Sequence, residues 1–433
     1  SELPTGSNIK FVRSLSQKEL FIGTENDGFF IYDIPAGTHQ HYTKENHKKL
    51  KSNCVRDVYI SAQNEIWMIQ GTDYKENTKH LLEAADLETE IKKKNGENKN
   101  CKIGIKPNLV APSEASYGGT THPEVVEGII EYLQERGYQN LVILEGSWVG
   151  DKTEESFEVC GYRKLSEKYQ VPLADMQKDS SSLCDCKGME LLICDTALKL
   201  DFLINVPVLK GHCQTKLTCA LKNLKGLIPN KEKRHFHTMG LHEPIAHLNA
   251  YLQQDFIVVD NICGDLDFED GGNPVVMNRI LAVTDPVLCD AYVCRFLNYE
   301  IKEVPYILMA EKLGVGSADI EHAVIKSCGT QTPTDAAILE VRKRKIVELL
   351  DAVEEVESCS ACYGYLMPAL DRLKEEGLLK KLDTKIAIGQ GFRGKSGTLG
   401  IGNCTAKFAC HLKGCPPTET EIYEFLKTYL TDI

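Results

Sequence analysis

One stretch of the sequence, residues 102–144, already restricts the fold class of the chain. Lys102–Lys106 is a short apolar run that Pro107 ends, and Leu141–Leu144 is a second such run, so both are expected to be strands. Between them, apolar residues recur with helical spacing over 126–133, and Gly137 ends the expected helix. A strand, a helical crossover and a second strand form a βαβ unit, whose two strands are parallel. The chain is therefore predicted to be an α/β protein with a mostly parallel sheet core.

Local signals mark the ends of further elements of this core. Thr121 and Glu124 are spaced as a capping box, with Pro123 in the first turn of the helix that follows. Phe202–Val206 and Phe256–Asp260 are two more apolar runs that end in polar loops, which adds two strands to the predicted sheet. Because ligands of open α/β sheets bind at the carboxyl ends of the strands, the loops after these runs are expected to form the ligand site.

The segment 204–248 is rich in positive charge and in histidine. It holds seven Lys and Arg and five of the twelve histidines, in a protein whose formal net charge is −12. A local excess of positive charge favours the binding of a small anionic ligand, although lysines of a solvated loop that cover apolar surface would give the same pattern. The predicted substrate-binding residues are Lys106, Asn108, Glu145, Lys222 and Asn223, and the predicted catalytic residues are Lys210 and His212, the latter as an acid/base near neutral pH.

Two smaller patterns in the core are compatible with a metal ion. His235 and His237 are two residues apart, which on a strand would place both rings on one face, either as metal ligands or as surface residues. The acidic loop 265–270 superficially matches a calcium loop, but its twelfth position is Val276 rather than Glu, so an EF-hand is not expected. The loop is predicted to be a solvated turn, with a Mg²⁺ site as the alternative.

Four cysteines near the C-terminus are spaced differently from the other thiols. Cys359 and Cys362 form a CxxC pair, and Cys404 and Cys415 follow in a glycine-rich loop. Four thiolates suit either zinc or a [4Fe–4S] cluster. An iron–sulfur cluster is favoured, because zinc ribbons normally use two CxxC pairs and because glycines let backbone N–H groups approach cluster sulfurs. Cys410 is the spare thiol, either a buried residue or an alternative ligand.

The glycine-rich loop also contains a pattern that is typical of nucleotide-binding proteins. Gly389–Ser396 matches both the dinucleotide-binding and the phosphate-loop consensus. Both motifs require a helix immediately after the loop, and Gly397, Gly400 and Gly402 interrupt any helix there. A nucleotide site is therefore the less favoured interpretation.

Composition argues against several functional classes. The excess of 62 Asp and Glu over 50 Lys and Arg argues against a nucleic-acid binder. No apolar run approaches the roughly 20 residues that a membrane-spanning helix needs, and no secretory signal opens the sequence, so a cytoplasmic protein without membrane contact is expected. Cys194, Cys219, Cys289 and Cys294 occur singly in apolar context, which indicates buried thiols of a reducing compartment.

Three domains are expected along the chain. Residues 1–70 form a small β-rich extension, residues 71–335 the α/β core, and residues 336–433 an α/β iron–sulfur module. In the extension, the triplet at Glu19 recurs in similar form at Glu65, 46 residues later, which is a spacing typical of propeller blades. The extension resembles the propeller repeats of bacterial two-component sensor proteins. Because a lone blade has uncovered edges, it is expected to be a docking module or a remnant of a fusion.

Residues 65–317 resemble the domain-of-unknown-function family 362. The matching pieces are "IKPNLV", "GGTTHPEVV", "INVPVLKGH", "LTCALKNLKGLIP" and "DPVLCDA". Members of that family are commonly described as iron–sulfur proteins, which implies a cluster here too. The C-terminal pieces "CSAC", "GNC" and "GCPPTETEIYEFL" are similar to the proximal-cluster region of nickel–iron hydrogenase small subunits. That resemblance implies that Cys359, Cys362, Cys404 and Cys415 hold a [4Fe–4S] cluster, and because no nickel ligands accompany them it does not imply the hydrogenase reaction.

These expectations combine into one leading function and two alternatives. The leading prediction is an iron–sulfur oxidoreductase whose [4Fe–4S] cluster passes electrons to a small anionic substrate or cofactor in the α/β cleft. The first alternative is a non-redox isomerase or transferase that acts on a carboxylate or phosphate and carries a structural cluster. The second is a ferredoxin-like electron carrier whose basic segment docks a redox partner protein.

Overall fold

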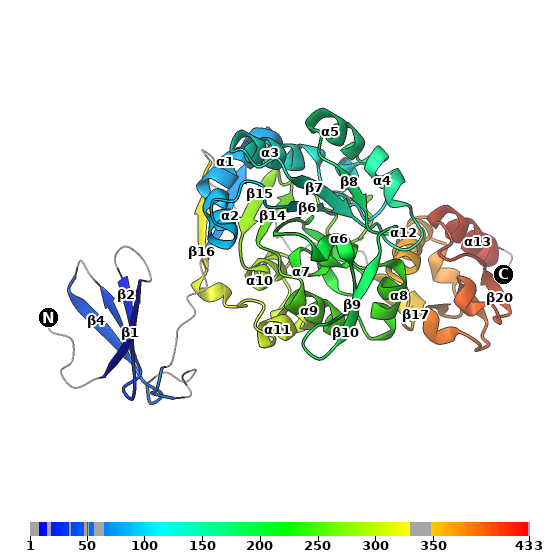
Figure 1. Cartoon of the computed structure of the whole chain (residues 1–433). Helices are drawn as coiled ribbons and strands as arrows, with labels where there is room; N and C mark the ends of the chain where they lie inside the picture. The colour runs from blue at the N-terminus through cyan, green and yellow to red at the C-terminus, as the bar shows by residue number, and fades with distance from the viewer. Residues whose placement is uncertain are drawn as a thin grey trace. The chain divides into compact units, whose positions relative to one another are not determined.

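The computed structural model describes residues 8–14, 19–33, 36–46, 50, 52–55, 65–329 and 348–431. The chain divides into two compact units, residues 1–62 and residues 63–433, whose elements are labelled in Figure 1. Among the helices of the described residues, none combines the length and the apolar character that a membrane crossing requires.

The first unit is a four-stranded antiparallel meander. Its strands are β1 (Ile9–Ser14), β2 (Glu19–Thr24), β3 (Phe29–Asp33) and β4 (Thr38–Tyr42), in that order across the sheet. Gly28, in the turn between β2 and β3, has φ +69°, a conformation that favours glycine. Phe21, Ile22 and Phe30 are buried within the unit. A propeller blade also has four strands, and the resemblance to propeller repeats stays a prediction.

The second unit is built on one eight-stranded sheet. In spatial order its strands are β16 (Val324–Ser327), β5 (Glu65–Gln70), β15 (Arg279–Val283), β14 (Phe256–Asn261), β11 (Phe202–Val206), β6 (Ile103–Pro107), β7 (Leu141–Glu145) and β8 (Leu173–Asp175). The five strands from β14 to β8 are parallel, and β15 runs antiparallel to both of its neighbours. The prediction of an α/β fold with a mostly parallel sheet is confirmed, including the parallel pair of β6 and β7.

Helices cover this sheet, and its strand residues alternate between two apolar cores (Figure 1). Ile143 and Leu144 pack into different cores, as Ile204 and Leu203 do, because successive side chains of a strand point to opposite faces. One core holds residues of α1 (Tyr74–Ala84), α2 (Leu87–Asn95), α3 (Pro123–Glu135), α4 (Thr153–Val159) and α5 (Tyr162–Tyr169). The other holds residues of α6 (Asp195–Leu198), α7 (Ala220–Asn223), α8 (Asn230–Thr238), α9 (His242–Tyr251), α10 (Pro286–Phe296) and α11 (Pro305–Lys312).

Two short antiparallel ladders complete the core. They pair β9 (Ser181–Asp185) with β10 (Glu190–Cys194), and β12 (Lys210–His212) with β13 (Lys216–Thr218). The second ladder lies in the basic segment 204–248, so part of that segment is sheet rather than loop.

The start of α3 differs from the prediction. His122 rather than Thr121 is the N-cap residue, and no side chain caps the first turn. The Thr121 hydroxyl instead donates to the carbonyl of Val206 and accepts the N–H of Asn108, both at 2.8 Å. The predicted capping box is therefore wrong, because the Thr121 side chain joins the carboxyl ends of β6 and β11.

The first unit ends at Ala62 rather than at residue 70. Glu65–Gln70 forms β5, which pairs with β15 and β16 in the core sheet. Ile66 and Met68 of this strand are fully buried in the core. The triplet at Glu65 is thus part of the core sheet, and residues 56–64 of the expected repeat lie outside the described residues.

A chain that begins at Gln63 is expected to remain folded and soluble, because it keeps every strand of the core sheet. A chain that begins at Gly71 lacks β5, which leaves β16 without its partner and one edge of β15 unpaired. Since unpaired strand edges favour aggregation, the soluble yield of this shorter chain should fall about tenfold or more. Size-exclusion chromatography compares the two truncations, and equal recovery would show that β5 is not needed to protect the sheet.

The C-terminal part of the second unit is a smaller α/β layer. β17 (Val353–Glu355), β18 (Ile386–Ile388), β19 (Leu399–Ile401) and β20 (Cys410–Leu412) form a parallel sheet in that order, and residues of α12 (Ser360–Glu375) and α13 (Glu419–Thr431) share its apolar core. After Gly389 the chain makes one short 3-10 turn, Gln390–Phe392, and continues into β19. Over residues 389–401, all of them described, the helix that both nucleotide motifs require is absent.

Candidate functional site

The carboxyl ends of β6 and β11 mark the topological switch point of the large sheet. From β6 the chain continues to β7 and β8 on one side, and it later returns to β11 and β14 on the other. The crevice at such a point is the usual ligand site of an open α/β sheet. Lys106 and Asn108 flank the end of β6, and Lys210 follows β11 at the start of β12. The sheet topology therefore brings the predicted residues of both strands to one edge.

A cavity with an empty volume of about 550 Å³ opens beside the ends of β6 and β7. Its wall has a cationic part and an apolar part, and it includes all five predicted substrate-binding residues. The lining residues are Lys106, Asn108, Val110, Glu145, Gly146, Trp148, Val149, Thr218, Lys222, Asn223, Lys225, Gly226, Lys233, His237, Glu269, Cys359, Ser360 and Ala361. We refer to it as the lysine cavity.

Four of the five predicted substrate-binding residues form one hydrogen-bonded group. Lys106 Nζ lies 2.8 Å from Glu145 Oε2 and donates to Asn223 Oδ1 at 3.2 Å. Asn223 Oδ1 also accepts from Asn108 Nδ2 at 2.8 Å. Burial lowers the pKa of Lys106, and the carboxylate of Glu145 partly opposes that shift. Because each of these polar groups has a partner within the protein, the group is pre-organised before any ligand binds.

Lys210 and His212, the predicted catalytic pair, lie behind the lysine cavity and are not part of its lining. Lys210 Nζ donates to the carbonyls of Gly119 and Glu269, both at 2.6 Å, and to Asn108 Oδ1 at 3.1 Å. Burial lowers the pKa of Lys210 to about 8. Fully engaged by protein acceptors, Lys210 ties the loop of Asn108 to the loop of Glu269.

Both nitrogens of the His212 ring face protein groups. Its Nδ1 accepts the N–H groups of Gln214 (3.0 Å) and Thr215 (3.1 Å), so the ring proton is assigned to Nε2, which lies 2.8 Å from Glu269 Oε2. Burial lowers the pKa of His212 to about 4. At neutral pH His212 is thus an uncharged ring that orients Glu269, and its acid/base role stays a prediction without a contact to the cavity.

Glu269 is a site residue that sequence reasoning missed. Its Oε1 accepts a hydrogen bond from Lys222 Nζ at 2.6 Å, and both side chains are buried. The neighbouring His212 ring and Lys222 ammonium hold the pKa of Glu269 well below its usual range, against the effect of burial. The solvated turn predicted for the loop 265–270 is wrong, because Asp265, Asp267 and Glu269 are all buried. Lys222 and Glu269 are 47 residues apart, so no local spacing could reveal their pairing.

Lys225, Lys233 and His237 are three further cavity residues that were not predicted as binding residues. Lys225 Nζ lies 3.3 Å from His237 Nε2. Burial, with the nearby charge of Lys222, lowers the pKa of Lys225 to about 7, and burial also lowers the pKa of Lys233 to about 8. Lys233 Nζ donates to the carbonyls of Gly146 (2.8 Å) and Ser147 (2.6 Å). The cavity thus holds more lysines than carboxylates.

The spacing of α8 explains which histidine reaches the cavity. His235 and His237 lie on this helix rather than on a strand, so their side chains point in different directions, and His235 is exposed beside Glu232. His237 shares a helix face with Lys233, four residues earlier. The shared metal site considered for the two histidines is therefore wrong, and helical rather than strand periodicity would have revealed the pair of Lys233 and His237.

Part of the cavity wall is apolar. Val110, Trp148 and Ala361 belong to one small buried cluster, and the Trp148 ring stands edge-on to Tyr365 with a centroid separation of 5.0 Å. The indole N–H of Trp148 donates to Asp151 outside the lining. The lining of this cavity therefore offers a ligand both ammonium groups and an indole side chain.

A second cavity, with an empty volume of about 380 Å³, is lined by Cys359, Cys362, Cys404 and Cys415. Cys410, on β20, is not part of this lining. Backbone of Gly389, Gly402 and Gly414 forms much of the remaining wall. We refer to it as the cysteine cavity, and it contains all four predicted cluster ligands.

The four thiols of the cysteine cavity are compatible with a cluster, and the identity of the cofactor stays a prediction. A zinc ion with Zn–S bonds of about 2.3 Å requires its sulfurs to lie within about 4.6 Å of one another. Among the described residues, the group of ligand atoms that converges within 4.8 Å is Cys219, Cys289 and Asp290, so no three of the four thiols do so. In a [4Fe–4S] cluster each thiolate binds a different iron, which separates the sulfurs more widely.

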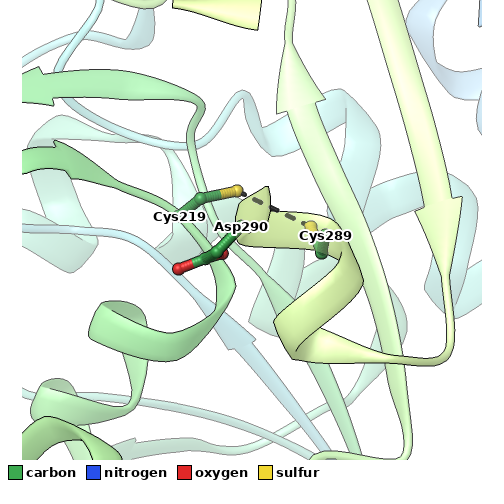
Figure 2. Close-up of side chains that lie close together, drawn as sticks. All are labelled: Cys219, Cys289 and Asp290. Atoms are coloured by element: carbon green, nitrogen blue, oxygen red, sulfur yellow. Dashed lines mark hydrogen bonds between the residues drawn. The ribbon is translucent and has the colours of Figure 1, made fainter. Parts of the chain in front are cut away.

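The close approach of Cys219, Cys289 and Asp290 has a structural explanation that does not require a metal ion (Figure 2). The two Sγ atoms are 3.9 Å apart, but the Asp290 carboxylate accepts the N–H groups of Ala220 (2.8 Å) and Leu221 (3.3 Å) at the start of α7. Burial raises the pKa of Asp290 to about 7. The group therefore anchors α7, which carries Lys222 and Asn223, to α10. The predicted burial of the apolar-context thiols is confirmed, since Cys194, Cys219, Cys289 and Cys294 are all buried.

Comparison with known proteins finds distant similarities. A thylakoid-associated protein of Synechocystis sp. is 24% identical over 231 residues, which cover 51% of this chain and 70% of that protein. The lactate racemase apoprotein of Thermoanaerobacterium thermosaccharolyticum superimposes with a TM-score of 0.37 at 17% identity, over 59% of this chain and 61% of that one. Residues 103–295, which carry most of the lysine cavity and end before the four cysteines of the cysteine cavity, match the family model of the domain of unknown function DUF362.

Proposed function

We propose that the protein is an iron–sulfur oxidoreductase that exchanges electrons with a small anion bound in the lysine cavity. One observation carries the proposal: Cys359 lines both the lysine cavity and the cysteine cavity. A cluster ligand in the wall of the substrate site would bring cluster and substrate into contact range, which electron transfer requires and a purely structural cluster does not.

In this proposal the cluster would be held by Cys359, Cys362, Cys404 and Cys415, and it would supply one-electron transfer. The side chains of the protein would bind and position the anion. Lys106 and Lys222 are paired with Glu145 and Glu269, whereas the hydrogen-bond partners of Lys225 and Lys233 within the described part of the chain are uncharged. These two amines are the groups that an anion would find available, and they would hold it beside Cys359.

His237 links Lys225 to Ser360, the residue next to Cys359. Its Nε2 lies 3.3 Å from Lys225 Nζ, 3.3 Å from the N–H of Ser360 and 3.2 Å from Ser360 Oγ. Ser360 follows Cys359 directly at the start of α12. An anion that binds Lys225 would therefore perturb the contact between Lys225 and His237. Through the contacts of His237 with Ser360, that change would reach the backbone next to Cys359.

Binding of an anion in the lysine cavity is expected to lower the midpoint potential of the cluster. A negative charge next to Cys359 opposes addition of an electron, by about 59 mV for each tenfold difference in anion affinity between the two redox states. Potentiometric titration of anaerobically purified protein, with and without phosphate, malonate and citrate, measures this shift. A cluster potential that none of these anions changes, although one of them binds, would favour a structural cluster, and the absence of any anion binding would favour the electron-carrier alternative.

Lys225 supports a second candidate, a non-redox isomerase or transferase that acts on a carboxylate or phosphate. A buried amine with a pKa of about 7 accepts and returns a proton at neutral pH, as acid/base catalysis requires. In that case the cluster would be structural, and its oxidation state would leave turnover unchanged.

Anion affinity is expected to fall as the pH rises from about 6 to about 8, because Lys225 loses its positive charge across its pKa of about 7. In a Lys225→Met variant the affinity at the lower pH should be about tenfold weaker and its pH dependence in this interval should flatten. Isothermal titration calorimetry with phosphate, malonate and citrate measures both. Lys231→Met removes an exposed lysine of α8 and should behave as the unmodified protein does.

A further inference from the structure

The loop around the cysteine cavity carries positive charge alone. Between Asp383 and Glu419 the sequence contains no Asp or Glu, although acidic residues outnumber basic ones across the chain. The same interval contains Lys385, Arg393, Lys395, Lys407 and Lys413. The local charge is therefore opposite in sign to the net charge of −12 that the whole protein bears.

Four of these basic residues line the cysteine cavity or lie within three residues of its lining in the sequence. Arg393 lines the cavity itself, Lys395 is two residues further along, and Lys413 adjoins Gly414 of the lining. Lys407 follows Cys404 on the same turn of chain, and all four side chains are exposed. We refer to Arg393, Lys395, Lys407 and Lys413 as the cationic rim.

The thiols of the cavity differ in their access to solvent. Cys415 is exposed, whereas Cys359 is partly buried and faces the lysine cavity as well. The carboxylates that most closely precede Cys359 in the sequence are those of Glu354, Glu355 and Glu357. None of these three residues lines the cysteine cavity. The cavity thus has an outer side with positive charge and an inner side that touches the substrate site.

We propose that the cationic rim docks a small acidic electron-carrier protein, which delivers electrons at the Cys404 and Cys415 side of the cluster. This inference rests on the proposed function, because it requires a cluster in the cysteine cavity. In the step, the reduced carrier loses one electron and the oxidised cluster gains it, with no bond made or broken. Opposite charges steer such encounters and set the orientation of the two proteins. Electrons then enter on the rim side and leave on the Cys359 side.

A charge-reversal pair of variants tests the docking surface. The rim variant combines Lys395→Glu, Lys407→Glu and Lys413→Glu, and the control combines Lys164→Glu, Lys199→Glu and Lys312→Glu, which are exposed lysines of the core. Both variants change the net charge equally. Iron and sulfide analysis first establishes that each preparation carries its cluster. Bleaching of the cluster by a reduced plant-type [2Fe–2S] ferredoxin, a small acidic carrier, is then followed by stopped flow, with reduced methyl viologen as the small-molecule comparison.

The rim variant is expected to be reduced by ferredoxin about tenfold more slowly than the wild type at low salt, and the control variant at the wild-type rate. Added salt should slow the wild type toward the rim variant, because it screens the attraction. Reduced methyl viologen, which is a cation, should not reduce the rim variant more slowly than the wild type. Equal ferredoxin rates for the rim variant and the wild type, or an equal slowing of the control, would overturn the proposal.

Cross-linking provides a readout that does not depend on turnover. Carbodiimide should couple oxidised ferredoxin to the wild type and the control but not to the rim variant. Binding to vesicles of phosphatidylglycerol and phosphatidylcholine without any coupling to ferredoxin would assign the rim to a membrane surface and overturn the carrier. If iron and sulfide are absent from every preparation, the proposed function is wrong. If the cluster is present but coupling to ferredoxin does not depend on the rim, only the docking proposal is wrong.

Discussion

Replacing Cys404 or Cys415 with serine is expected to abolish the visible absorption of anaerobically purified protein and to remove most of its iron and sulfide. The intact protein should contain roughly four of each per chain, as a [4Fe–4S] cluster with four cysteine ligands does. Serine retains the shape of the side chain but not the thiolate on which the cluster depends. Both cysteines line the cysteine cavity, so either change removes one of four donors.

Cys410→Ser is the matched control for this experiment. Cys410 lies on β20 in the same module, but it does not line the cysteine cavity. Its replacement should leave iron, sulfide and absorption unchanged. Loss of the cluster in Cys410→Ser together with its retention in Cys404→Ser would exchange the two assignments, and stoichiometric zinc without sulfide would exclude a cluster altogether.

Replacing Glu269 with alanine is expected to lower the free energy of unfolding by about 3–5 kcal/mol, because it leaves the buried Lys222 ammonium without its counter-charge. His212 would also lose the carboxylate that its Nε2 faces. Urea unfolding followed by tryptophan fluorescence measures the loss. Glu354→Ala, which removes an exposed carboxylate of the module, should change stability by less than about 0.5 kcal/mol.

The effect of Glu269 has a predictable pH dependence. Its pKa in the folded protein is well below its ordinary value of 4.5, so ionised Glu269 stabilises the folded state above that value. As the pH falls below 4.5 toward the folded-state pKa, the unfolded chain takes up the proton first and the stabilisation is lost. The stability difference between the wild type and Glu269→Gln should therefore shrink in acid. A difference that stays constant down to about pH 3 would show that Glu269 is not held ionised by its neighbours.

The sequence alone determined the architecture of the core. Apolar runs bounded by Pro107 and Gly137, with a helical pattern between strands, define a parallel βαβ unit through local periodicity and chain geometry. The same logic placed Lys106 and Asn108 at the carboxyl edge of the sheet, because position along a parallel strand is fixed by sequence order. The four cavity cysteines were identified by their spacing and glycine context.

Local signals failed where side chains had tertiary partners to satisfy. Thr121 had the right spacing for a cap, yet its hydroxyl bonds to Val206 and Asn108, which come from other strands. The triplet at Glu65 has a blade-like pattern, yet it pairs with β15 and β16 because its apolar side chains are buried in the core.

The composition of the lysine cavity was decided only by the tertiary structure. Glu269 pairs with Lys222 across 47 residues, and no periodicity connects an acidic loop to a lysine on another element. The shifted pKa of Lys225 likewise arises from burial and from charges that folding brings together. Spacing along the chain determines which residues reach an edge of the sheet. Burial and charge pairing depend on distance in space, and they determine the charge and the partners of each residue there.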